Sequence, residues 1–167
     1  MAIDADWLAG ATLAQLSTAR GTLADGDGCG AAVVEAFARR ALAIGEPLLA
    51  WDAVDEHRAR PGCEADLVHV AALALLRSGA LERAIALLEP LRAAGADDEE
   101  TTGLLARAHK ARWRETGGAD ELRRSLALYE EAWARTGGIW SGINAATLSL
   151  CAGDAARARA RARDRIQ

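Results

Sequence analysis

The chain has 167 residues and a formal net charge of −4, and its composition is 51% hydrophobic but only 4% aromatic. This length suits one domain with a real core, and the negative charge argues weakly against a general nucleic-acid binder. The strong helix formers Ala, Leu, Arg and Glu dominate the sequence, so we expect an all-α domain.

The first predicted element is a single helix over residues 4–21, capped by Asp4 or Asp6. Its apolar stripe consists of Trp7, Leu8, Ala11 and Ala14. A glycine-rich loop follows over residues 21–30. We therefore expect residues 1–30 to form an N-terminal helix and loop that precede the main domain.

From residue 31 onward, short predicted helices come in pairs that are separated by tight glycine turns. They span residues 31–44, 47–59, 65–78, 80–94, 97–115, 119–136, 139–152 and 154–167. The pairs repeat after about 34 residues, which is the tetratricopeptide period. The third pair is longer by about seven residues, which we place in an extended turn, RWRETGGADE.

Small residues recur where the paired helices must cross closely. The first crossing has Ala38, Ala72, Ala106 and Ala146, and the second has Ala50, Ala84, Ser125 and Ala158. The bulky residues Leu88 and Tyr129 each lie four residues after the small residue of the second crossing. Ala132 is the small residue expected near the end of the predicted helix 119–136. This agreement predicts a right-handed α-solenoid of about four tetratricopeptide-like helix pairs over residues 31–167.

Three segments resemble the TRAFs-binding domain, which occurs in stress-activated MAP kinase kinase kinases and in bacterial tetratricopeptide proteins. They are EETTGLLARAHKARW, LRRSLALYEEAWARTGG and IWSGINAATLSL, of which GINAATL is the most specific part. The resemblance covers roughly residues 31–160 and implies a scaffold that binds partner proteins and has no chemistry of its own. Relatives usually continue with further helices after this point. A second departure from the family is the final predicted helix, which has Ala where bulky apolar residues are expected.

The helix that contains GINAATL has a structural explanation. We expect Ser141 or a neighbour to cap it, and Gly142, Ala145 and Ala146 to let the preceding helix approach. Gly153 is then expected to make the turn that ends it. A catalytic loop is not needed to account for this stretch.

The inner face of such a solenoid is lined by the first helix of each pair. The candidate partner-binding residues on this face are Arg39, His69, Arg77, Arg107, Lys110, Trp140 and Asn144. Basic side chains beside an amide could hold an acidic or carboxylate-bearing peptide segment. The alternative is that Asn144 ties neighbouring helices together and the arginines are merely solvated.

The cysteines Cys29, Cys63 and Cys151 are odd in number, widely spaced and without a CxxC pair, which fits neither a disulfide framework nor a zinc site. The N-terminus lacks the features of a signal peptide, and no apolar run is long enough to span a membrane. We therefore expect a cytoplasmic protein without a metal or cofactor.

No constellation of acid, base and nucleophile appears, so we expect no catalytic activity. The sequence favours a protein–protein interaction scaffold or adaptor in bacterial signalling or effector regulation. The alternative is a self-assembling module of a larger effector or signalling enzyme, with a homodimer formed through the terminal helices.

Overall fold

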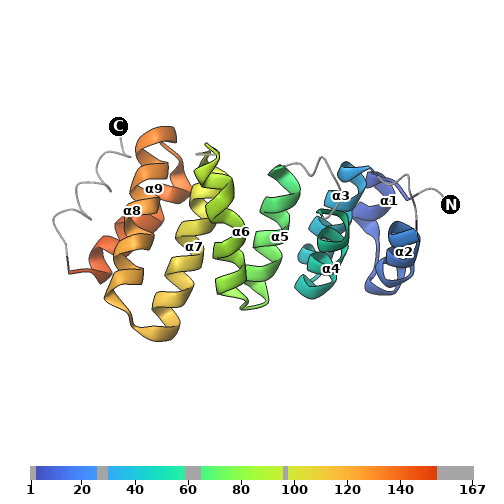
Figure 1. The fold of residues 1–167 in the computed structure, drawn as a ribbon, viewed down its shortest axis with the longest axis horizontal. Coiled ribbons are helices and arrows are strands. Elements are labelled where there is room, and N and C mark those ends of the chain that lie inside the picture. The colour runs from blue at the N-terminus through green and yellow to red at the C-terminus, as the bar shows by residue number, and fades with distance from the viewer. Residues whose placement is uncertain (1–2, 26–29, 59–64, 96–97, 154–167) are drawn as a thin grey trace. The chain divides into compact units, whose positions relative to one another are not determined.

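The computed structural model describes residues 3–25, 30–58, 65–95 and 98–153 (Figure 1). These residues form helices and no strand, so the all-α prediction is confirmed for them. The helices are α1 Ala5–Gly10, α2 Leu13–Asp25, α3 Ala31–Ala43, α4 Pro47–Arg58, α5 Ala65–Arg77, α6 Leu81–Ala93, α7 Glu99–Thr116, α8 Ala119–Thr136 and α9 Ile139–Cys151. Two compact units, Met1–Leu87 and Leu88–Gln167, are described separately below.

The N-terminal segment forms two helices, so the prediction of a single helix was wrong. The Asp4 carboxylate caps α1 by accepting a hydrogen bond from the Trp7 amide at 2.9 Å. A second start follows at Thr12, whose amide donates to Gln15 Oε1 at 2.8 Å while its hydroxyl accepts from the Gln15 amide at 3.4 Å. This reciprocal capping box begins α2, which continues into the predicted loop as far as Asp25.

The first unit buries the small residues where the register predicts helix crossings. Ala38, Ala50, Ala72 and Ala84 are all completely buried, whereas Ala14 of the predicted N-terminal stripe is exposed. Backbones can approach closely at such positions because no large side chain separates them. The Trp51 ring is also buried, and the Arg83 guanidinium lies 4.5 Å from its centroid in a cation–π contact.

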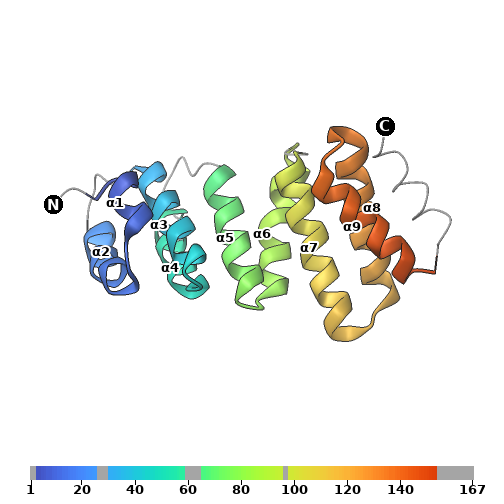
Figure 2. The ribbon, with the colours of Figure 1, turned by 180° about the vertical axis from the view of Figure 1, so that it is seen from behind.

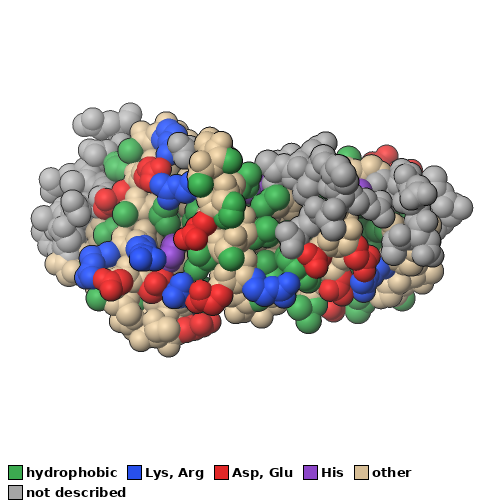
Figure 3. Space-filling model, in the orientation of Figure 1, with side chains coloured by type: hydrophobic (Ala, Val, Ile, Leu, Met, Phe, Trp, Pro, Cys, Tyr) green, Lys and Arg blue, Asp and Glu red, His purple; other side chains and the backbone are tan. Residues whose placement is uncertain are grey.

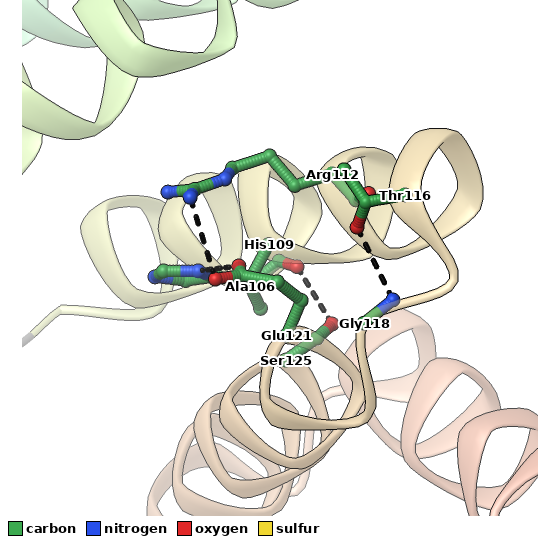
Figure 4. Close-up of polar contacts among 7 residues, drawn as sticks. All are labelled: Ala106, His109, Arg112, Thr116, Gly118, Glu121 and Ser125. Carbon is green, nitrogen blue, oxygen red and sulfur yellow. Dashed lines mark hydrogen bonds and ion pairs between the residues drawn. The ribbon is translucent and has the colours of Figure 1, made fainter.

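In the second unit, α7 and α8 form a long antiparallel pair with polar ties at the crossing (Figure 4). The Ser125 hydroxyl is buried and donates to the Ala106 carbonyl at 2.7 Å. His109 Nδ1 lies 2.7 Å from Glu121 Oε2, and the other oxygen of this carboxylate lies 3.5 Å from Arg112 Nη2. His109 therefore joins α7 to α8.

The extra residues of the third pair are helical, which corrects the prediction of an extended turn. Both α7 and α8 have 18 residues, and the turn between them is only Gly117–Gly118. Gly117 takes the left-handed conformation with φ of 71°, and the Gly118 amide donates to Thr116 Oγ1 at 3.2 Å. Good helix formers on both sides of the glycines favour this extension.

The last described helix, α9, packs against α8 and lies beside α7 (Figure 2). Gly142 and Ala145 are buried as predicted, whereas Ala146 is only half-buried. Gly138, and not Ser141, occupies the N-cap position. Gly153 makes the expected turn with φ of 81°, while Ala158 and the rest of the final predicted helix lie outside the described residues.

Candidate functional site

The candidate residues of the first unit are held by other groups of that unit. Arg39 Nε donates to Glu35 Oε1 at 2.6 Å, one helical turn away on α3. Arg77 Nη1 donates to the Leu42 carbonyl at 2.8 Å. His69 was predicted to line the inner face. It is only 7% exposed, because the apolar helix α5 is buried over most of its circumference, so the His69 side chain does not line an open surface.

In the second unit, basic side chains form a stripe along α7. Arg107, Lys110 and Arg114 are spaced three and four residues apart, which places them on one face of the helix. Lys110 Nζ donates to Asn144 Oδ1 of α9 at 2.8 Å, and Asn144 Nδ2 donates to the Trp140 carbonyl at 3.0 Å. We call these five residues the α7–α9 basic surface.

Among the described residues, no carboxylate pairs with the cations of this surface. Burial lowers the pKa of Lys110 most, and the positive charges of Arg114 and Arg107 lower it further against a smaller opposing effect of Cys151. Across the described ranges, Arg107, Lys110 and Arg114 make no ion pair with a carboxylate. The surface therefore presents uncompensated positive charge that a bound anion would stabilise.

Cations and carboxylates alternate instead on the face of the second unit that carries α8 (Figure 3). Glu131 there accepts from Arg92 and from Arg135, each at 2.6 Å. Asp120 and Arg123 form another pair on the same helix. Such exposed pairs contribute little stability. They do neutralise each other, which distinguishes this face from the α7–α9 basic surface.

Trp140 gives the basic surface an apolar edge. Its ring packs over Gly103 of α7, where an added Cβ would lie 3.0 Å from Trp140 Cζ3. The ring also meets Tyr129 edge to face, with centroids 5.3 Å apart and an interplanar angle of 76°. Trp140 is nevertheless 50% exposed, so a positioned aromatic face remains open to a partner.

A side-chain hydrogen bond holds α9 beside α7, and the sequence analysis did not predict it. The buried Ser141 hydroxyl donates to Glu99 Oε1 at 2.7 Å. The same carboxylate occupies the space that a Cβ at Gly138 would need. Sequence reasoning also missed Arg114, although its spacing from Arg107 and Lys110 was the signal that could have identified it.

Other kinds of site find no support within the described ranges. No group of three or more His, Cys, Asp or Glu side chains there could hold a metal ion. None of the helices that the structure describes is long and apolar enough to cross a membrane.

The family model of Tetratricopeptide Repeats-Sensor, TPR-S, matches residues 45–149. The chain belongs to this family. It is thus a tetratricopeptide protein, as the repeat period predicted, and helical-repeat folds of this type serve as protein–protein interaction scaffolds. No curated protein sequence matches it significantly.

Solved structures agree with this fold. MamA 41-end from Desulfovibrio magneticus RS-1 has a TM-score of 0.70 and 15% identity, with 90% of this chain and 83% of that chain covered. The human IFIT1 dimer with PPP-AAAA has a TM-score of 0.71 and 16% identity, with 89% of this chain covered. The match spans only 34% of the IFIT1 chain. These likenesses confirm the predicted class, an all-α solenoid of tetratricopeptide-like helix pairs.

Proposed function

We propose that this protein is a non-catalytic scaffold whose α7–α9 basic surface binds a carboxylate-rich segment of a protein partner. The observation that carries the proposal is the stripe of Arg107, Lys110 and Arg114, which makes no ion pair with a carboxylate among the described residues. Beside it, Asn144 retains a second amide hydrogen and a second oxygen lone pair besides those bonded to Lys110 and the Trp140 carbonyl. The half-exposed Trp140 supplies an apolar face. Guanidinium groups bind carboxylates through paired hydrogen bonds, which suits this ligand class.

Lys110 provides a direct way to observe binding, because it is the single lysine in the chain. Reductive methylation with ¹³C-formaldehyde would give one side-chain resonance besides that of the N-terminal amine. Burial and the neighbouring Arg114 lower the pKa of Lys110, and a bound carboxylate raises it again. Binding is therefore strongest below that pKa and weakens as the pH rises through it.

The test titrates a glutamate-rich peptide, with a glutamine-rich peptide of equal length as the neutral control. We expect only the acidic peptide to shift the Lys110 resonance. The double variant Arg107→Glu/Lys110→Glu should lose at least about tenfold in affinity by calorimetry. The matched variant Arg123→Glu reverses an exposed charge on α8 and should bind within about twofold of the unchanged protein.

Three results would contradict the proposal. The first is equal binding of both peptides, and the second is an equal loss of affinity in Arg123→Glu. The third is a fall in melting temperature of Arg107→Glu/Lys110→Glu that accounts for its loss of binding, since those residues would then be structural. If a short oligonucleotide displaces the acidic peptide at a concentration below that of the peptide, the ligand class is nucleic acid and not a carboxylate-rich protein segment.

We further propose that residues 31–167 form the scaffold, with residues 1–30 preceding it, and that it acts in a cytoplasmic bacterial signalling or effector system. The resemblance of GINAATL to the TRAFs-binding domain supports this context, and the word sensor in the family designation agrees with it. Partner capture from the source cell tests it. Signalling or effector proteins should be recovered with the unchanged protein and lost with Arg107→Glu/Lys110→Glu.

A further inference from the structure

The side of α9 that faces away from its packed neighbours is an apolar stripe. Ile139, Ile143 and Leu150 are 72%, 56% and 57% exposed. Their spacing places them within an arc of about 40° on the helix. The helix contains no charged residue over its 13 positions. Three large aliphatic side chains are therefore exposed together, without the charges that normally solvate a surface helix.

Alignment of the repeats indicates which kind of element packs against such a face. When Ala106 is aligned with Ala146, the equivalents of the α9 stripe on α7 are Glu99, Gly103 and Lys110. Each of these contacts α9, through Ser141 at 2.7 Å, the Trp140 ring and Asn144 at 2.8 Å, respectively. This face of a first helix is thus the position where the next helix of the same type packs. On α9, the side chains in this position, Ile139, Ile143 and Leu150, are instead more than half exposed.

We propose that the α9 helix of a second copy of this chain covers the stripe. In an antiparallel pair related by a twofold axis, Ile139 of one protomer lies opposite Leu150 of its partner. Ile143 then lies opposite the half-buried Ala146 of its partner. The axis passes between Asn144 and Ala145, so both halves of the contact are the same. An apolar stripe arranged in this way is complementary to itself.

Charge and composition favour a second copy over the other candidate occupants. Because α9 carries no charge, two copies meet without like-charge repulsion, and a charged partner finds no counter-ion on the stripe. Residues 154–167 of the same chain contain five arginines and only one large aliphatic residue, Ile166. That composition supplies too little apolar surface to match three exposed aliphatic side chains.

The stripe is short, since a 13-residue helix is about 20 Å long. A contact of this size belongs with small, weak interfaces, so we expect a dissociation constant on the order of 10–100 µM. Asn144 lies about 120° round α9 from the middle of the stripe. The dimer therefore leaves Asn144 and the cations of α7 open, and this inference is independent of the proposed function.

The test is sedimentation equilibrium of the full chain over about 1 to 500 µM, a range that brackets the expected dissociation constant. The unchanged protein should dimerise, and Ile143→Asp should weaken the dimer at least about tenfold. Leu48→Asp is the matched control because Leu48, on α4, is also exposed, at 65%. It should dimerise as the unchanged protein does. Circular dichroism at the lowest concentration should give equal melting temperatures for all three proteins.

Each other result overturns the inference. A chain that stays monomeric throughout the range has no such dimer. Equal weakening by Leu48→Asp would show a non-specific apolar association. A lower melting temperature of dilute Ile143→Asp would mean that this chain's own residues already cover the stripe.

Discussion

Two adjacent threonines at the start of α7 differ in the hydrogen bonding of their hydroxyl groups and allow a sharp test of the structure. Thr101 and Thr102 are both completely buried. The Thr101 hydroxyl donates to Asp98 Oδ2 at 3.0 Å, and the Thr101 amide donates to the other carboxylate oxygen at 2.8 Å. The Thr102 hydroxyl has no hydrogen-bond partner among the described residues. Replacement by valine removes each hydroxyl while keeping the branched shape.

The two replacements should change stability in opposite directions. A buried hydroxyl without a partner costs about 1–3 kcal/mol, so Thr102→Val should raise the free energy of unfolding by about 1 kcal/mol. Thr101→Val removes a bond to a charged group, worth about 1.5–3 kcal/mol, but keeps the amide bond to Asp98. We expect it to lower the free energy of unfolding by about 1.5 kcal/mol. The helix propensities of Thr and Val are nearly equal and cancel.

Guanidinium chloride denaturation followed by circular dichroism measures both variants. The transition midpoints should move apart while the m-value stays constant, since neither change alters the surface exposed on unfolding. A Thr102→Val variant that is destabilised by about 0.5 kcal/mol or more would refute the reasoning, because its hydroxyl would then have a partner. Equal shifts in the same direction would mean that side-chain packing, and not hydrogen bonding, controls both positions.

Substitutions at three further positions test the α7–α8 pair by the same denaturation assay. Ser125→Leu should lower the free energy of unfolding by about 2–4 kcal/mol, because the larger side chain overpacks the crossing and the bond to Ala106 is lost. Ser125→Ala should lower it by at most about 1 kcal/mol. Similar effects of the two variants would disprove the close crossing. Gly117→Ala should cost about 1–2 kcal/mol because φ there is 71°, and no effect would argue against that turn. Glu121→Ala should cost about 1–3 kcal/mol because it leaves buried His109 unpaired, and a neutral result would contradict the pairing.

Local composition made most of the second unit predictable. The glycines at 117 and 153 marked turns that the structure contains, and both have positive φ. The predicted bounds of α8 agree with the observed helix, Ala119–Thr136. The error in the N-terminal segment of the first unit came from local hydrogen bonds that override composition. The capping box of Thr12 and Gln15 divides the N-terminal helix in two, although helix-forming residues surround it.

The candidate site was only partly predictable, because side chains with the same register have different surroundings. His69 and Lys110 were both assigned to an inner face, yet His69 is buried within the apolar surroundings of α5. Lys110 instead reaches Asn144 of another helix, which no pattern within α7 specifies. The role of Ser141 also depends on Glu99, which is 42 residues away.

The sequence alone determined the repeat, because the period of small residues and glycines is a local property of each helix pair. It could not determine which cations remain without a carboxylate, since an ion pair depends on the distance between groups on different helices. Nor could it reveal that Ile139, Ile143 and Leu150 stay exposed, since burial depends on the neighbours that a helix acquires. The tertiary structure decided those two points, and both proposals depend on them.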